Sequence, residues 1–307
     1  MPTPIDPRGE DNPSTYFVED RSSNPEMIRL MIQDRFLTDG MGGPLAEQSD
    51  PASLHRVLDV GCGPGGWILE AARLYPHMEL VGIDISWRMI EYARAQAQAM
   101  HLTDGVKFLV MDALQPLDFP DGSFDLVNMR LASSFMLVKD WPRLLQELLR
   151  VIRPGGTVRV TEGGNIRNSS PALTRLGQMM FLSGYKAGQS MSPEQWGITS
   201  ILGQLLSESG CQNVQTKAYT LEYPAGTVAA QNFAQDSMYL FQTLRPFLHK
   251  WECAPADYDA IYEQALIEMQ QKDFHAAWDF LMAWGTKPEH KQEKLNGERR
   301  PDVANTD

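Results

Sequence analysis

The stretch VLDVGCGPGGW, residues 57–67, joins an apolar run to a glycine-rich turn and then to a helical segment. Because glycine has no Cβ, the backbone N–H groups of such a turn and the positive end of the following helix can lie directly beside a ligand. Gly61, Gly63 and Gly66 satisfy the pattern GxGxxG, which leaves NAD, FAD and S-adenosylmethionine open. Asp59 favours the last of these, since a carboxylate there can hold a cationic amine, whereas a dinucleotide pyrophosphate is already negative.

Two further acidic residues follow the next two apolar runs. Asp84 stands in LVGIDIS and Asp112 in VKFLVMDALQ, each at the expected end of a strand. A carboxylate at the first position can accept hydrogen bonds from ribose hydroxyls. One at the second can accept from an adenine amino group while the amide of Ala113 donates to a ring nitrogen. Helix capping or turn formation is the alternative role for either residue alone. Together with Asp59 they predict a ligand crevice at the carboxyl edge of a parallel sheet.

Short apolar runs alternate with helical stretches along the chain, which predicts βαβ units and a parallel sheet covered on both faces. The expected strands are residues 56–60, 79–83, 106–111, 124–129, 157–161, 214–223 and 277–284. The expected helices are residues 24–37, 66–74, 89–100, 141–152, 171–184, 193–209, 228–250 and 255–272. The turn Pro154-Gly155-Gly156 is expected to separate the preceding helix from a strand that starts directly after it.

Composition and charge exclude several classes of protein. Among 307 residues, 27 Lys and Arg face 39 Asp and Glu, so the net charge is −12 and no nucleic-acid partner is expected. The three cysteines and six histidines are too scattered for a disulfide framework or a metal site. The polar, proline-rich start differs from a secretory signal, and no apolar run reaches the roughly 18–20 residues of a bilayer span. A soluble, cytoplasmic protein is expected.

Four motifs in order and spacing carry a resemblance to a known family. VLDVGCGPGGW, LVGIDIS, VMDALQPLDFPDGSFDLV and LLRVIRPGGTVRV resemble the class I S-adenosylmethionine-dependent methyltransferases, and within them the ubiquinone/menaquinone C-methyltransferase-like group of small-molecule enzymes. The match covers residues 55–162. It implies a Rossmann-like α/β fold whose seven-stranded sheet has helices on both faces and an antiparallel last strand. It also implies S-adenosylmethionine as cofactor. The motifs, the resemblance and the N-terminal helix together give these expected cofactor-binding residues: Tyr16, Arg29, Asp59, Gly61, Gly63, Asp84, Ile85, Met89, Asp112, Ala113, Met129 and Arg130.

The segments outside this core predict a lid and an acceptor pocket. The expected parts are disordered tails at 1–14 and 286–307, an N-terminal lid helix in 15–45, and a methyltransferase domain at 46–285 with helical insertions near 165–210 and 225–275. Glu26, Arg29 and Gln33 share one helix face, which is either solvated or closes over the cofactor with Tyr16 toward the substrate. Asp39–Gly43 is the expected hinge or lead-in loop. The Met- and aromatic-rich insertions form either core or an apolar acceptor cavity.

These features predict an enzyme that moves the methyl group of S-adenosylmethionine to O, N or C of a small, apolar or aromatic acceptor, mainly by positioning and by excluding water. One alternative uses the bound cofactor without methyl transfer, as a cyclase or decarboxylase would. An NAD-dependent oxidoreductase is disfavoured by Asp59, Asp112 and the RPGG turn. No catalytic residue and no metal are assigned, and a homodimer is left open. The side chains that could act as a base are Tyr16, Glu162, Tyr185, Asp236, His249 and His275.

Overall fold

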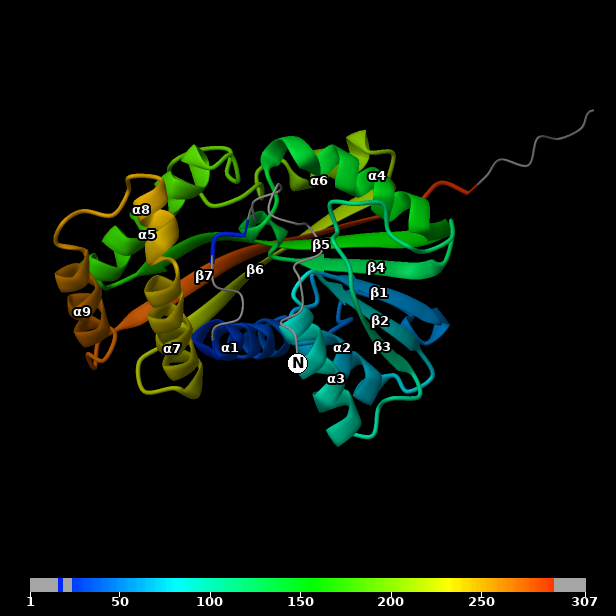
Figure 1. The fold of residues 1–307 in the computed structure, drawn as a ribbon, viewed down its shortest axis with the longest axis horizontal. Helices are drawn as coiled ribbons and strands as arrows, with labels where there is room; N and C mark the ends of the chain where they lie inside the picture. The colour runs from blue at the N-terminus through cyan, green and yellow to red at the C-terminus, as the bar shows by residue number, and fades with distance from the viewer. Residues whose placement is uncertain (1–15, 19–23, 290–307) are drawn as a thin grey trace, which may run out of the picture.

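The computed structural model describes residues 16–18 and 24–289, and its strands and helices alternate as expected (Figure 1). The strands are β1 (Arg56–Val60), β2 (Glu79–Asp84), β3 (Val106–Val110), β4 (Phe124–Arg130), β5 (Ile152–Asn168), β6 (Gln212–Pro224) and β7 (His275–Thr286). The helices are α1 (Asn24–Gly40), α2 (Gly66–Leu74), α3 (Trp87–Ala99), α4 (Trp141–Val151), α5 (Pro171–Lys186), α6 (Leu202–Glu208), α7 (Val228–Thr243), α8 (Arg245–Lys250) and α9 (Tyr258–Glu268).

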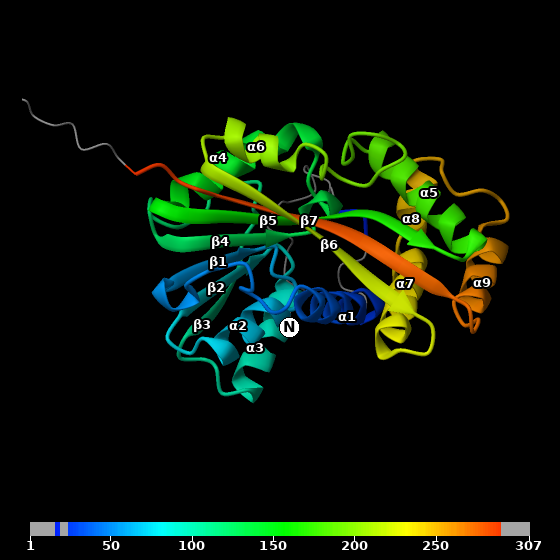
Figure 2. The same cartoon turned by 180° about the vertical axis from the view of Figure 1, so that it is seen from behind.

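The seven strands form one sheet in the order β3-β2-β1-β4-β5-β7-β6. Neighbouring strands from β3 to β5 pair in parallel, whereas β7 pairs antiparallel with both β5 and β6. Val57, Leu58 and Val60 of β1 are fully buried, as a parallel strand with both faces covered requires. Helices α4 and α6 lie on one face and α2 and α3 on the other (Figures 1 and 2). The expected α/β sheet with an antiparallel last strand is confirmed.

The strands β5, β6 and β7 are much longer than the other four and extend beyond them. Their extended ends carry α5, α7, α8 and α9, which lie together at one end of the molecule (Figure 1). These helices, α1 and the strand ends share a hydrophobic cluster rich in aromatic side chains, including Phe233, Phe241 and Trp278. The insertions therefore have a core of their own beside the sheet.

Several expected boundaries differ from the structure. The strand β5 starts at Ile152, before the Pro-Gly-Gly turn, because Ile152 pairs with Phe124 and a register shift precedes the next pair, Leu126 with Thr157. Residues 193–201 form turns, so only α6 remains of the helix expected at 193–209. The helix expected at 228–250 divides into α7 and α8, where Pro246 supplies no N–H to continue the first helix.

The bounds expected for the hinge and the tails also differ from the structure. The helix α1 continues to Gly40, so the hinge expected at Asp39–Gly43 begins inside the helix. Thr286 belongs to β7 rather than to a tail. The tail expected at 1–14 and residues 290–307 of the tail expected at 286–307 lie outside the described residues. Within the described ranges, no helix combines the length and apolar character needed to cross a bilayer.

Candidate functional site

A cavity of about 700 Å³ adjoins the carboxyl ends of the parallel strands and extends among the helical insertions. Its walls come from the turn after β1, the ends of β2, β3 and β4, one face of α1, and parts of β5, α5, α7 and β7. The expected cofactor residues that line it are Tyr16, Arg29, Asp59, Gly61, Gly63, Asp84, Ile85, Met89, Asp112, Ala113 and Arg130. Because the strand ends and the helical insertions line one and the same cavity, a cofactor and a second molecule can meet inside it.

The glycine-rich turn after β1 has the backbone conformation that its sequence predicts. Gly61 and Gly63 have φ values of +69° and +52°, in the left-handed region that side chains disfavour. The Gly63 N–H donates to Asp84 Oδ2 at 2.9 Å, and the Ser86 N–H donates to Asp84 Oδ1 at 2.8 Å. The carboxylate of Asp84 is therefore fixed at the cavity wall, and a carboxylate at this position can accept hydrogen bonds from hydroxyl groups.

Asp112 has one oxygen occupied and one unpaired. Its Oδ1 accepts from the Leu114 N–H at 2.9 Å, whereas its Oδ2 is buried and has no hydrogen-bond partner among the described residues. An unpaired buried carboxylate oxygen is costly, and a ligand donor at this wall would remove that cost. An adenine amino group is such a donor. The residues at this end of the cavity therefore fit an adenosyl ligand, which the resemblance implies.

A buried chain of hydrogen bonds lies under the glycine turn and ends on Asp59. Asn128 Nδ2 donates to Asp59 Oδ1 at 2.7 Å, and Arg159 Nε donates to Asn128 Oδ1 at 2.8 Å. The Arg159 guanidinium also pairs with Glu47 Oε1 at 2.6 Å. Burial raises the pKa of Asp59 to about 7, and the charge of Arg130 and the Asn128 bond oppose this. A cationic amine beside this carboxylate would favour its charged form.

Arg159 and Glu47 were not identified from the sequence. The available signal is the arginine within TVRV, a charged residue inside an otherwise apolar strand. Such a residue is almost never fully buried unless it is paired. The position of its partner in the loop after α1 could not be read from the pattern, because it depends on how that loop folds back on the sheet.

Arg130, at the end of β4, bonds to two side chains of α1. Its guanidinium forms an ion pair with Asp34 and donates to Thr38 Oγ1 at 3.1 Å. Leu30 of the same helix lies over the glycine turn, where a Cβ added to Gly63 would be 3.9 Å from its Cδ1. The helix is thus held against the edge of the sheet at the point where the cavity begins.

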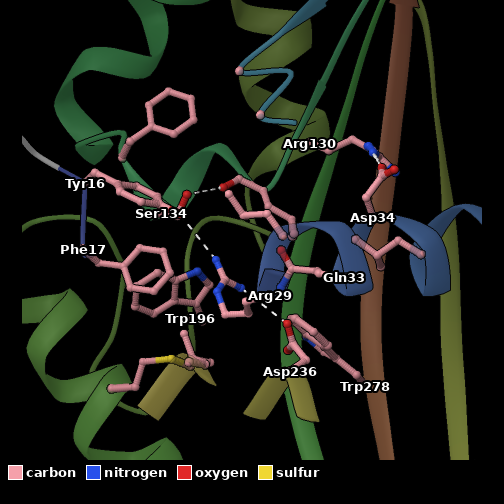
Figure 3. A pocket seen from close by; sticks show the side chains of 18 of the residues that line it. Tyr16, Phe17, Arg29, Gln33, Asp34, Arg130, Ser134, Trp196, Asp236 and Trp278 are labelled. Atoms are coloured by element: carbon pink, nitrogen blue, oxygen red, sulfur yellow. Dashed lines mark hydrogen bonds and ion pairs between the residues drawn. The ribbon is translucent and has the colours of Figure 1, made fainter. Parts of the chain in front are cut away.

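The inner face of α1 is buried, so the solvated alternative for Glu26, Arg29 and Gln33 is wrong. Arg29 Nε and Nη2 donate to the two oxygens of Glu26 at 2.8 and 2.7 Å, and Tyr16 OH donates to Glu26 Oε1 at 2.5 Å. Arg29 Nη1 lies 3.6 Å from Asp236 Oδ1 on α7. Arg29 therefore lies between Tyr16 and Asp236 (Figure 3).

The rest of the cavity wall is largely apolar. Phe17, Met180, Trp196, Phe233, Leu240, Phe241 and Trp278 line it. Phe17 and Trp196 make an edge-to-face contact with ring centroids 5.8 Å apart. Side chains of this kind suit an apolar or aromatic molecule.

The structure places three expected site residues outside the cavity wall. Met129 is buried in the core of the sheet. Glu162 accepts from the backbone N–H groups of Ala132 and Ser133, at 2.7 and 3.2 Å, and burial raises its pKa to about 7. His249 is exposed, beside Arg245.

The other side chains that could act as a base divide into two groups. Tyr185 and His275 are exposed and do not line the cavity. Tyr16 and Asp236 both line it. Asp236 was one of several bases considered from the sequence, and only the packing of α7 against α1 brings it to the wall.

Comparisons with known proteins agree with this architecture. A family model described as a methyltransferase domain matches residues 57–156. Demethylmenaquinone methyltransferase of Staphylococcus aureus is 30% identical over 194 residues, covering 58% of this chain and 74% of that protein. The enzyme of the same name from Thermus thermophilus is 41% identical over 107 residues, covering 35% of this chain and 46% of that protein.

A solved structure of Haemonchus contortus phosphoethanolamine N-methyltransferase 2 with S-adenosyl-L-methionine shares the fold. Its TM-score is 0.53 at 20% identity, with 89% of this chain and 60% of that chain covered. The chain spans only 27% to 46% of the length of four of the curated relatives that it matches. The ordered motifs, the strand order and the long match to the Staphylococcus protein lead to one conclusion: this chain belongs to the class I S-adenosylmethionine-dependent methyltransferases.

Proposed function

We propose that this protein transfers a methyl group from S-adenosylmethionine to an oxygen, nitrogen or carbon atom of a small, largely apolar or aromatic molecule. The observation that carries the proposal is the single cavity of about 700 Å³ that joins the strand-end carboxylates to the aromatic wall. When bound, S-adenosylmethionine supplies a methyl group already activated by its sulfonium. The protein then has to hold, align and dehydrate the two molecules.

At the cofactor end, each carboxylate has a separate task. Asp112 accepts from the adenine amino group with its unpaired Oδ2, and Asp84 accepts from the ribose hydroxyls. Asp59 attracts the ammonium group of the amino-acid portion. Gly61 and Gly63 allow close approach of the backbone. We expect Arg130 to exchange Asp34 for the carboxylate of the cofactor, which would couple the position of α1 to binding.

At the acceptor end, α1 and the insertions enclose the reacting groups. Gln33 and Leu37 of α1 face the cavity together with aromatic residues of α7 and β7. An enclosed apolar wall favours a small molecule over a nucleic acid, and the net charge of −12 favours it further. Relatives named as methyltransferases of demethylmenaquinone, a quinone, support an acceptor of largely apolar character.

Asp84→Ala tests the cofactor end. We expect the affinity for S-adenosylhomocysteine, measured by calorimetry, to fall about 100-fold, because two hydrogen bonds to a charged group are lost. The Gly63 N–H also loses its acceptor. Asp118→Ala is the control, since that aspartate is exposed and does not line the cavity. Binding that is unchanged in Asp84→Ala, or absent in the unmodified protein, contradicts the proposed function.

Asp112→Ala tests recognition of the base. The unmodified protein should prefer S-adenosylhomocysteine over S-inosylhomocysteine, which has a carbonyl in place of the adenine amino group. We expect the variant to lose about tenfold of this preference, because the unpaired Oδ2 is the acceptor for the amino group. The ratio of the two affinities is the readout, since any rearrangement of the loop at Leu114 affects both ligands equally. A ratio that stays the same rules out this role of Asp112.

Accumulation of S-adenosylhomocysteine distinguishes methyl transfer from the alternative of cyclase or decarboxylase type. We expect one equivalent of S-adenosylhomocysteine for each methylated product, measured by chromatography of the same reaction. Product that forms while the cofactor is recovered unchanged would favour the alternative.

A further inference from the structure

The guanidinium of Arg130 lies at the cofactor end of the cavity and is paired there with α1. It forms an ion pair with Asp34, and its Nη1 donates to Thr38 Oγ1 at 3.1 Å. The side chains of Arg130 and Asp34 are only 14% and 16% exposed. Both line the cavity, and their charged groups face each other in Figure 3. The chain therefore places one of its own carboxylates on the arginine that ends β4.

The carboxylate of Asp34 also lies against the start of α2. A Cβ added to Gly66, the first residue of that helix, would overlap Asp34 Oδ2. Gly65 at the N-cap supplies no side-chain hydrogen bond to the helix. The first N–H groups of a helix have no partner within it, and the positive end of the helix favours an anion. Arg130 and the start of α2 thus form an anion site, which Asp34 fills.

Asp59 stands beside this anion site. Burial raises the pKa of Asp59, the charge of Arg130 opposes this shift, and the charge of Asp34 adds to it. The amino-acid portion of S-adenosylmethionine carries an ammonium group and a carboxylate. Asp59 suits the ammonium group, and the anion site suits the carboxylate. Asp34 therefore fills the place that suits one half of this portion.

The other cations at the cavity wall already have partners. Three arginines in the described part of the chain line the cavity, and of these Arg29 pairs within α1 and Arg167 pairs with Asp279. A ligand carboxylate at the strand ends would therefore be bound by Arg130. If Asp34 stayed in place, two carboxylates would share one guanidinium, and like charges at this distance repel each other.

We propose that Asp34 is an internal competitor for the carboxylate of the cofactor, and that it thereby sets the affinity and the ligand selectivity of the cofactor site. This inference rests on the proposed function and adds a regulation of the same site. Without cofactor, Arg130 and α2 hold Asp34. To receive a ligand carboxylate they release Asp34, so binding is weakened by the free energy that separates the pair. A ligand without a carboxylate leaves the pair intact.

A carboxylate at this place has one alternative role, which is to bind the ammonium group together with Asp59. The ion pair argues against it, because Asp34 is already neutralised by Arg130 and its charge disfavours the charged form of Asp59. The two roles predict opposite results. Removal of a competitor tightens the binding of the cofactor, whereas removal of a ligand contact weakens it.

Calorimetry on the full chain with two ligands tests the competitor role. S-adenosylhomocysteine carries both the ammonium group and the carboxylate, and its decarboxylated analogue keeps only the ammonium group. We expect Asp34→Asn to bind S-adenosylhomocysteine about tenfold more tightly than the unmodified protein, because Arg130 no longer releases a carboxylate. The analogue should bind no more tightly. The ratio of the two affinities is the readout, since changes at Asp59 act on the ammonium group that both ligands share.

Two further variants show whether Asp34 acts through Arg130. Asp39→Asn is the matched control on the same helix, because Asp39 is 74% exposed, lies 3.8 Å from Arg35 and does not line the cavity. It should leave the ratio unchanged. Arg130→Gln removes the cation, so Asp34→Asn added to it should no longer raise the ratio. A ratio that is equal or lower in Asp34→Asn, or that still rises beside Arg130→Gln, overturns the proposal.

The same titrations separate this inference from the proposed function. Failure of the unmodified protein to bind S-adenosylhomocysteine contradicts the proposed function. Normal binding of S-adenosylhomocysteine that Asp34→Asn does not tighten contradicts the competitor role alone.

Discussion

Replacement of Arg159 by methionine is expected to lower the free energy of unfolding by about 3–5 kcal/mol, the usual cost of removing one partner of a buried ion pair. The side chains of Arg159 and Glu47 are each 1% exposed, and their charged atoms lie 2.6 Å apart. The guanidinium also stacks on Trp67, with its central carbon 5.0 Å from the ring centroid, and donates to Pro44 O and to Asn128. The variant leaves the Glu47 carboxylate buried without a cation.

Two further variants isolate the buried charge in urea unfolding experiments. Arg73→Met removes the partner of Glu70 in an exposed pair on α2 and should cost far less stability than Arg159→Met, because solvent screens an exposed pair. The double variant Glu47→Gln with Arg159→Met should be more stable than Arg159→Met alone, because it no longer buries a charge. A double variant no more stable than Arg159→Met, or an Arg159→Met variant as stable as the unmodified protein, would show that the pair is not energetically coupled.

Asp236→Asn is expected to stabilise the protein more strongly at pH 8 than at pH 5. In the folded chain the carboxyl has a pKa of about 7, whereas in the unfolded chain the value is the ordinary one near 4. Between these values the folded state holds a proton that the unfolded state has released, so this group favours folding less as the pH rises. Above pH 7 the lost stability is of the order of 4 kcal/mol at 1.36 kcal/mol per pKa unit. An asparagine, which does not titrate, avoids this loss.

Urea unfolding of both proteins at pH 5, 6, 7 and 8 measures the effect. The difference in the free energy of unfolding should grow in favour of the variant as the pH rises. Asp118→Asn, at an exposed position, is the control. A constant difference across the series would mean that Asp236 titrates normally in the folded protein.

The sequence predicted the sheet well because its signals are local. An apolar run buried on both faces, a glycine turn and an amphipathic helix each depend on a few neighbouring residues, and β1 and α2 have the expected boundaries. The errors fell where a distant contact decides the structure. Residues 193–201 are helix-like in composition but form turns, in which Gly197 approaches the side chain of Ser133, which follows β4. No local pattern contains that contact.

Of the candidate site, too, only the part that depends on local signals could be predicted. Of the eleven expected cofactor residues that line the cavity, nine lie at or just after the carboxyl ends of parallel strands, which meet at one edge as the order of the motifs requires. The other two, Tyr16 and Arg29, come from the N-terminal segment and α1. The acceptor end was not predictable at the level of single residues. The helix face with Glu26 and Arg29 has an ordinary solvated pattern, and only its contact with α7 buries it.

By itself, then, the sequence determined the fold class, the cofactor and the strand-end residues that line the cavity, since these depend on residue types at fixed positions relative to strand ends. The tertiary structure alone decided which charges are buried together: Arg159 with Glu47, and Arg29 with Glu26 and Asp236. These pairs join segments up to about 200 residues apart. Their energies depend on desolvation, which is a property of the packed interior and has no counterpart in a local stretch of sequence.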